Sequence, residues 1–195
     1  MRKTPYVIAI SLALTACQPS HPEDASASAT DAASDAKAPV QTGMTTPEAA
    51  PAPGLSPADA EALGILSAIN RFEIDAARQA RDHDLPDDVE TFADTMEREH
   101  MDNETTIARI GKPRASEKSE AQNASGQAQL LSLQAHTDDY AQAYVAAMTR
   151  GHAETLETLD AVLIPSVTTA AVKTHLLMTR DAVAMHLKMA KSLKP

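Results

Sequence analysis

The sequence predicts an all-α protein whose C-terminal part is an antiparallel four-helix bundle. Apolar residues recur at the spacing of an α-helix through most of residues 57–195. Aromatic residues make up only 3% of the chain and tryptophan is absent, which disfavours a β-sandwich built on aromatic and β-branched side chains. Proline and glycine divide the periodic part into four long segments, and segments joined in this way form a four-helix bundle.

Residues 1–17 have the features of a bacterial lipoprotein signal peptide. Arg2 and Lys3 are followed by an apolar run that is too short to span a bilayer. Residues 14–17, Leu-Thr-Ala-Cys, match the lipobox of bacterial lipoproteins. By that resemblance, Cys17 becomes the mature N-terminus and carries acyl chains that anchor the protein to a membrane. The alternative is a lone cysteine beside an ordinary cleavage site.

The residue after Cys17 predicts where the anchored protein resides. Lipoproteins retained in the inner membrane commonly have Asp at this position, whereas this chain has Gln18. The resemblance therefore implies a periplasmic protein anchored in the outer membrane. Cys17 is the single cysteine, so no disulfide is expected despite the oxidising compartment.

Residues 18–56 are predicted to be a disordered tether. Proline is interleaved with Ala, Ser, Thr and acidic residues, and apolar periodicity is missing. A coil of about 40 residues has a root-mean-square reach of roughly 35 Å. The tether would hold the bundle, predicted over 57–195, away from the membrane.

The first two helices are predicted over 57–82 and 87–110. Ser56 suits the N-cap of the first helix and the proline that follows it suits the first turn. Glu73 falls in the middle of the apolar face of that helix. In the second helix His100 occupies an apolar position, and Glu97 precedes it at the i, i+3 spacing that places both side chains on one face.

The third helix is predicted over 128–163, after a polar crossover loop at 112–127. An imidazole, His152, again lies at the centre of the apolar stripe, and Pro165 is expected to end the helix. The fourth helix is predicted over 167–193. Its apolar side contains two histidines, His175 and His186.

Each predicted helix therefore carries an ionisable group on its buried face. Burying a lone charged group costs several kcal/mol unless it is paired, neutral or metal-bound, so we expect these groups to meet. Glu73 and His100 lie at similar distances from the turn between their helices, which sets them nearly level. In the fourth helix either His175 or His186 could complete the group.

Several segments of the bundle resemble the DUF4142 family of bacterial envelope proteins. The resemblance spans about 57–193 and is carried by Phe72-Glu73, Phe92-Ala93, Glu99-His100, Tyr144–Met148 running into His152, and Met185–Ala190. It implies a ferritin-like four-helix bundle without an established activity. The recurring polar residues of the family fall on Glu73, His100, His152 and His186.

The chain departs from the family pattern at two places, and from the motifs of di-iron proteins at a third. Ala141 stands where the family commonly has an acid, and Arg180-Asp181 replace a Leu-Pro pair, so the kink expected in the last helix is absent here. Ferritin-like di-iron proteins use two Glu-x-x-His motifs. Here Val183 stands at the matching position before His186, so a full di-iron site is not predicted.

One interpretation of the polar groups is a transition-metal site. His100, His152 and His186 would supply nitrogen ligands, and Glu73 and Glu97 would supply oxygen. This donor set suits zinc, iron, copper or manganese. Three methionines near the histidines of the last helix hint at copper, although methionines at helical spacing usually fill a core. They are Met178, Met185 and Met189.

Two other functions remain open, and both are non-catalytic. The groups can form a buried Glu/His network that only sets the register of the bundle, or the bundle can be an interaction module for another envelope protein. Nucleophilic catalysis is disfavoured, because the single cysteine is used for lipidation and no serine lies in a nucleophile-elbow pattern. The formal net charge of −10 excludes a nucleic-acid surface.

Overall fold

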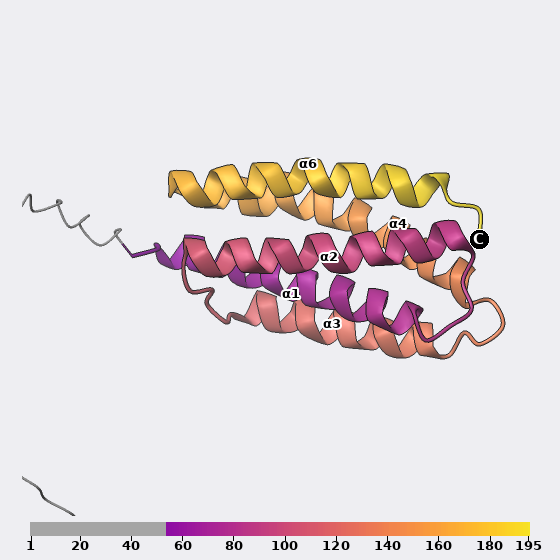
Figure 1. Ribbon diagram of the computed structural model, residues 1–195. Helices are drawn as coiled ribbons and strands as arrows, with labels where there is room; N and C mark the ends of the chain where they lie inside the picture. The colour runs from indigo at the N-terminus through magenta and orange to yellow at the C-terminus, as the bar shows by residue number, and fades with distance from the viewer. Residues whose placement is uncertain (1–53) are drawn as a thin grey trace, which may run out of the picture. The chain divides into compact units, whose positions relative to one another are not determined.

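The structure, a computed structural model, describes residues 54–195, and this part of the chain is all-α, as predicted (Figure 1). The predicted signal peptide, Cys17 and nearly all of the predicted tether lie outside these residues. Among residues 54–195, no helix is both long and apolar enough to cross a bilayer. The elements are α1 (Pro57–Ala80), α2 (Asp87–Ile110), α3 (Glu117–Gln134), α4 (Tyr140–Thr158), the π-helix η1 (Leu159–Leu163), α5 (Ile164–Ser166) and α6 (Ala170–Ser192).

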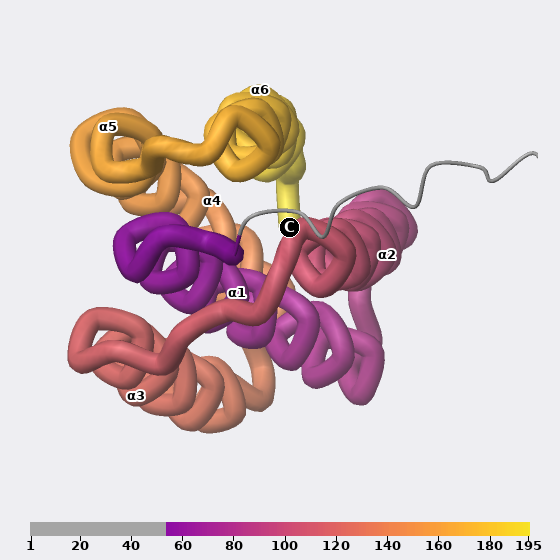
Figure 2. The backbone as a smooth tube through the Cα atoms, turned by 90° about the vertical axis from the view of Figure 1, so that its left-hand side faces the viewer, coloured from indigo at the N-terminus to yellow at the C-terminus, as the bar shows by residue number. Residues whose placement is uncertain are grey.

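Four long helices form the bundle, and a fifth packs outside it. Viewed along the bundle, α1, α2, α6 and α4 surround a common interior, while α3 lies against the outer side of α1 (Figure 2). Each long helix runs opposite to the one before it in the chain (Figure 1). Neighbours around the bundle are therefore antiparallel.

The first hairpin has the boundaries that its sequence predicts. Ser56 caps α1 in a capping box with Asp59, and Pro57 occupies the first turn. The helix ends at Ala80, slightly before the predicted end. The second helix spans the predicted 87–110 and ends before Gly111.

The prediction of a long loop at 112–127 is wrong, because most of it belongs to α3. Ser116 caps this helix in a capping box with Ser119. Its buried side is a narrow line of Ser119, Gly126 and Leu133, so the large apolar residues that reveal a helical stripe are missing. The small residue at position 126 allows α3 to approach α1 closely, since a Cβ at Gly126 would lie 3.0 Å from the Cβ of Phe72.

The predicted third helix is also displaced. The chain leaves helical conformation after Ala135, and α4 begins at Tyr140. From there α4, η1 and α5 continue without a break to Ser166, so Pro165 lies inside the last turn. The π-helical segment absorbs the change in hydrogen bonding just before this proline. The last helix, α6, is uninterrupted at residues 180–181, as the missing Leu-Pro pair predicts.

The interior consists of two apolar clusters separated by a polar layer. The first cluster includes Phe72, Phe92, Met96, Tyr144 and Met148. The second includes Leu66, Ile107, Leu159, Leu176 and Val183. On α2, α4 and α6 the predicted histidine lies between the segment that contributes to one cluster and the segment that contributes to the other. On α1, Glu73 directly follows Phe72, the first residue of the first cluster, so it lies at the border of the same layer.

A second buried carboxylate, Asp59, joins the start of α1 to the segment before α6. Its oxygens accept hydrogen bonds from the backbone N–H groups of Thr168 (2.9 Å) and Thr169 (3.2 Å). They also accept from the hydroxyls of Ser56 (2.6 Å), Thr169 (2.7 Å) and Thr168 (3.2 Å), and from the backbone N–H of Ser56 (3.3 Å). Burial by itself would raise the pKa of Asp59, but these hydrogen bonds outweigh it and hold the pKa well below 3.8.

Candidate metal centre

Three imidazoles from three different helices converge in the polar layer. One ring nitrogen from each of His100 (α2), His152 (α4) and His186 (α6) lies within 4.8 Å of the other two. The ring centroids are 5.4–6.1 Å apart. All three side chains are buried. We call these residues the imidazole group; of the two histidines open on the last helix, His186 is the one that joins it.

The other nitrogen of each ring is bound to an acceptor outside the group. His100 Nδ1 is 2.9 Å from Asn70 Oδ1, and His152 Nδ1 is 2.7 Å from the carbonyl oxygen of Met148. His186 Nε2 is 2.7 Å from Glu99 Oε2. A carbonyl or carboxylate oxygen only accepts, so in each pair the imidazole donates its N–H.

The amide orientation of Asn70 is set by a second row of acceptors. Its Nδ2 donates to Asn103 Oδ1 (2.9 Å) and to Glu104 Oε1 (2.7 Å), so its Oδ1 is left to accept from His100. Glu104 is in turn held by the hydroxyl of Ser67 at 2.8 Å. This network fixes the tautomer of His100 with its lone pair on Nε2.

The second nitrogen of each ring carries the lone pair and is unpartnered in the described part of the chain. Within residues 54–195, no hydrogen-bond partner reaches His100 Nε2, His152 Nε2 or His186 Nδ1. Burial lowers the pKa of His100 well below 6.5, and the two neighbouring imidazoles lower it further. Burial also lowers the pKa of His186, against the opposing effect of Glu99. Both rings are therefore neutral at neutral pH, which is the form that ligates metals.

Glu73 lies beside the imidazole group but behind one of its rings. Its Oε1 is 3.8 Å from His152 Nδ1, the nitrogen that already donates to a backbone carbonyl. In the part of the chain that the structure describes, its Oε2 has no hydrogen-bond partner. Burial raises the pKa of Glu73 above 4.5, although His152 opposes the rise. Burial likewise raises the pKa of the Tyr144 hydroxyl well above 10.0, and the nearby Glu73 adds to that effect.

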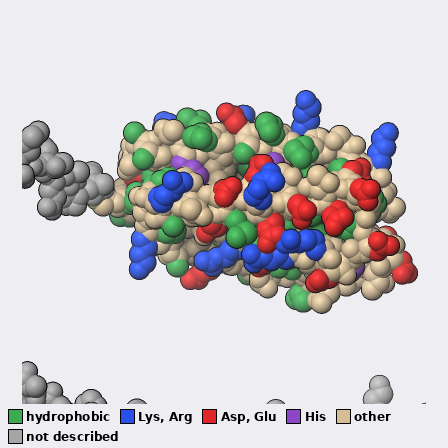
Figure 3. Space-filling view, in the orientation of Figure 1, with side chains coloured by type: hydrophobic (Ala, Val, Ile, Leu, Met, Phe, Trp, Pro, Cys, Tyr) green, Lys and Arg blue, Asp and Glu red, His purple; other side chains and the backbone are tan. Residues whose placement is uncertain are grey.

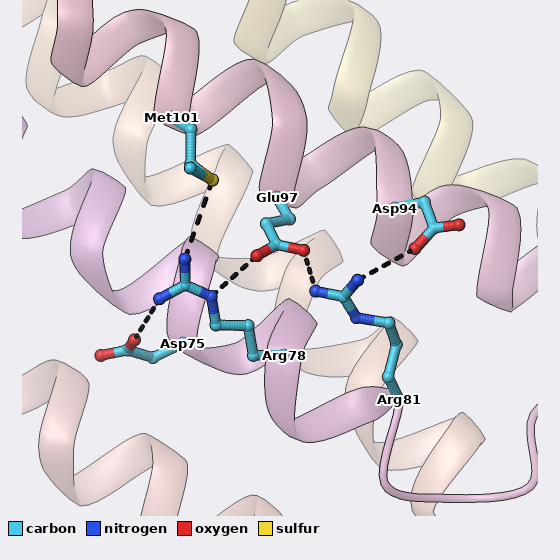
Figure 4. Close-up of polar contacts among 6 residues, drawn as sticks. All are labelled: Asp75, Arg78, Arg81, Asp94, Glu97 and Met101. Carbon is cyan, nitrogen blue, oxygen red and sulfur yellow. Dashed lines mark hydrogen bonds and ion pairs between the residues drawn. The ribbon is translucent and has the colours of Figure 1, made fainter.

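The structure does not bring the other predicted oxygen ligand, Glu97, to the imidazole group. Its carboxylate pairs with Arg78 at 2.7 Å and with Arg81 on the outer side of the α1–α2 hairpin (Figure 4). Glu97 is one helical turn from His100, but the side of α2 that it occupies faces the arginines of α1. A Glu-x-x-His spacing places two side chains near each other without deciding which neighbours they meet.

The sequence prediction missed the residues that orient the imidazoles. Asn70 had a detectable signal, because it is a polar residue beside Ile69 on the buried side of its helix. Glu99 had none, since its partner His186 is far away in the sequence and its own side chain is partly exposed. Such acceptors are recognisable only once the helices are packed.

The remaining histidine of the last helix, His175, is buried on α6 outside the imidazole group. Its Nε2 has no hydrogen-bond partner among the described residues. Burial lowers the pKa of His175, with a smaller opposing effect from Glu104. Three methionines near the histidines of α6 are candidates for core residues or for copper ligands. Met178 and Met185 are 68% and 62% exposed, whereas Met189 packs against the first cluster.

A groove between α2 and α6 runs past the imidazole group. It has a volume of about 660 Å³, and its wall includes His100, His186 and His175 but not His152. Histidine side chains are visible from outside between these two helices (Figure 3). The centre is therefore enclosed by α1 and α4 and bordered by the groove on its α2–α6 side.

The chemistry of this arrangement is that of a nitrogen-donor metal site. Three imidazoles with convergent ring nitrogens match the three-histidine ligand sets of zinc proteins, and imidazole also suits iron, copper and nickel. The N–H group of each ring donates to Asn70, a backbone carbonyl or Glu99. Acceptors of this kind usually orient histidine ligands of metals. The donor atoms of the imidazole group fit a single ion of this class.

Comparison with known proteins assigns the chain to a family. The model of DUF4142, described as a domain of unknown function, matches residues 44–193. Searches of curated proteins and of solved structures returned no match. The family match covers the whole bundle, including all three members of the imidazole group. The chain therefore belongs to the DUF4142 family.

Proposed function

We propose that this protein binds one transition-metal ion through His100, His152 and His186, and that a lipid on Cys17 anchors it in the bacterial envelope. The observation that supports metal binding is the set of three buried ring nitrogens, one on each neighbouring imidazole, that have no protein partner within residues 54–195. Each buried polar atom left unsatisfied costs roughly 1–3 kcal/mol. One ion would satisfy all three at once.

The surroundings of the group favour a cation over a purely structural network. A structural network of histidines would pair one ring with the next, whereas here every N–H donates to an acceptor outside the group and the other nitrogen of each ring has no partner within residues 54–195. Two carboxyl groups, Glu73 and Glu99, lie directly behind two of the rings. They can offset the positive charge that an ion brings into the interior.

The donor set predicts an order of affinity among metals. Neutral nitrogen ligands bind divalent ions with the strength Mn²⁺ < Fe²⁺ < Cu²⁺ > Zn²⁺. Three imidazoles leave at least one coordination position of a tetrahedral ion free. We therefore expect Cu²⁺ and Zn²⁺ to bind most tightly, and Mn²⁺ most weakly.

Elemental analysis of the full chain, purified without a histidine tag, tests the ion site. We expect close to one equivalent of metal in the wild type after reconstitution with Zn²⁺ or Cu²⁺, and none in His152→Ala. His136→Ala is the matched control, because His136 is 42% exposed and pairs with Asp139 in the loop before α4. Failure of the wild type to retain any of the four candidate metals would leave a structural or protein-interaction module as the better interpretation.

Membrane anchoring is tested separately at Cys17. The wild type, expressed in a Gram-negative host with labelled palmitate, should incorporate the label and sediment with outer-membrane vesicles. Cys17→Ser should lose both properties while keeping its metal content. A wild-type protein that stays unlabelled and free in the periplasm would contradict the lipid anchor without affecting the ion site.

A further inference from the structure

The groove between α2 and α6 provides a route from solvent to the proposed ion. His100 and His186 line the groove, while His152 lies on the far side of the imidazole group. The remaining side is enclosed by α1, where Asn70 and Glu73 are buried. A fourth ligand that is not part of the protein must therefore approach from the groove.

The groove exists because α6 presents small side chains to α2 over much of its length. Ala170, Ala171 and Ala182 lie where large apolar residues would fill the space between the helices. The volume of about 660 Å³ lies within the range of small-molecule sites, which is roughly 300–1,000 Å³. This is enough room for an organic molecule larger than a water or a simple anion.

The walls of the groove favour an uncharged and largely apolar occupant. Ile110, Val183 and Met178 supply apolar surface. The charged residues on the wall are Glu99 and Asp102, and within the described chain no lysine or arginine lines the groove. An anion would therefore meet negative charge without a cationic partner.

Two polar residues of the wall are bonded to each other. The amide of Asn103 donates to the hydroxyl of Thr179 at 2.8 Å, and this bond crosses from α2 to α6. His175 also belongs to the wall, but it is only 7% exposed, and its Nε2, which has no hydrogen-bond partner among the described residues, is buried. A ligand in the groove would therefore find a largely apolar surface, with the proposed ion as an electrophilic point at the inner end.

We propose that the α2–α6 groove binds an uncharged organic molecule whose apolar body lies along α6 and whose single nitrogen or oxygen donor takes the open position of the metal ion. This inference rests on the proposed ion site. It adds the class of the second ligand and the direction from which that ligand arrives.

Three probes and the full chain loaded with Co²⁺ test the proposal, because the visible spectrum of Co²⁺ reports its ligands directly. Imidazole supplies the donor alone, 4-phenylimidazole adds an apolar body, and benzoate has a similar size but is anionic. We expect 4-phenylimidazole to bind at least about tenfold more tightly than imidazole, as burial of a phenyl ring predicts. Benzoate should bind more weakly than 4-phenylimidazole by at least the same factor.

A groove-filling variant locates the binding site. Ala182→Trp should leave the Co²⁺ stoichiometry unchanged and weaken 4-phenylimidazole binding by about tenfold or more, with a smaller effect on imidazole. The matched control is Ala124→Trp, at an exposed position of α3, which does not line the groove. Ala171→Trp, at an exposed position of the groove wall, repeats the test if Ala182→Trp fails to fold.

The outcomes separate this inference from the ion site. Absence of Co²⁺ binding would overturn both. Bound Co²⁺ whose spectrum does not respond to imidazole would overturn the inference alone, since no open position would be reachable. Equal affinities for imidazole and 4-phenylimidazole, or equal binding by the groove variants and the control, would also overturn it.

Discussion

Two carboxyl groups are buried on the same helix, α1, and they differ in their hydrogen bonding and in the direction of their pKa shifts. Asp59 accepts six hydrogen bonds from Ser56, Thr168 and Thr169, and hydrogen bonds from these residues hold its pKa below the ordinary value. Glu73 has one oxygen without a partner in residues 54–195, and burial raises its pKa. Protein groups thus satisfy the carboxylate of Asp59, whereas they leave one oxygen of Glu73 unsatisfied in this part of the chain.

This difference separates a structural site from a site prepared for a ligand. Asp59 resembles a helix cap extended across the fold, in which each acceptor has its donor. Around Glu73, the polar layer contains buried nitrogen and oxygen atoms without a hydrogen-bond partner among the described residues. Their burial costs free energy, which the apolar clusters on both sides must offset. Unsatisfied groups of this kind are tolerated where a ligand, ion or ordered water completes them.

The largest expected effect is the loss of Asp59. Asp59→Ala removes the acceptor of three backbone N–H groups and three hydroxyls, and leaving such buried donors unpaired should lower the free energy of unfolding by about 3–5 kcal/mol. Urea unfolding at pH 7 measures this, with the exposed Asp138→Ala as control. A loss below about 1 kcal/mol, the typical effect of a surface change, would contradict the structural role.

The stabilisation by Asp59 should also depend on pH in a defined direction. Because its folded pKa lies below the unfolded value near 3.8, its contribution is complete above that pH and is lost as the pH falls through the folded pKa. The difference in the free energy of unfolding between the wild type and Asp59→Ala should therefore become smaller as the pH is lowered. A difference that widens at low pH would reverse the assignment of Asp59 as an anion.

The next effect is stabilisation by metal at the incomplete site. A divalent ion at 100 times its dissociation constant should raise the free energy of unfolding by about 2.7 kcal/mol. His100→Ala should abolish that gain, because the ion then loses one of three nitrogen ligands. Chemical unfolding with Zn²⁺ and with EDTA measures the difference, and equal stabilisation of the variant would place the ion elsewhere.

A smaller effect is expected from Glu73→Gln in metal-free protein. A carboxyl group and an amide are similar in shape, so the change in the free energy of unfolding should stay below about 1.5 kcal/mol, the scale of one hydrogen bond. The raised folded pKa means that the contribution of Glu73 is present below 4.5 and lost as the pH rises through the folded pKa. The stability of the variant relative to the wild type should therefore increase as the pH rises, and a constant difference would contradict a raised pKa of Glu73.

The smallest effect is expected at Glu97, the carboxylate on the surface of the hairpin. Its arginine partners are 40–51% exposed, so Glu97→Ala should cost less than about 1 kcal/mol. Metal content should stay at the wild-type value, because the side chain faces away from the imidazole group. Loss of the ion in this variant would restore the oxygen-ligand role predicted from the Glu-x-x-His spacing.

Much of the layer was predictable because it depends on helical periodicity. His100 and His152 stand in stripes of apolar residues, and a polar residue at such a position is conspicuous in a single sequence. The position of α3 was not predictable in the same way, since its contact with α1 relies on Gly126 rather than on large apolar residues. Close packing of small side chains leaves little trace in a hydrophobic pattern.

The sequence by itself determined the all-α class, the boundaries of the first hairpin and the presence of an ionisable group on the buried face of every bundle helix. These properties depend on residues a few positions apart. Only the tertiary structure decided that His186 rather than His175 joins the group, that Glu97 turns to Arg78 and Arg81, and that the groove lies beside the imidazoles. Those outcomes depend on how the helices rotate and slide against one another, which no spacing within one helix specifies.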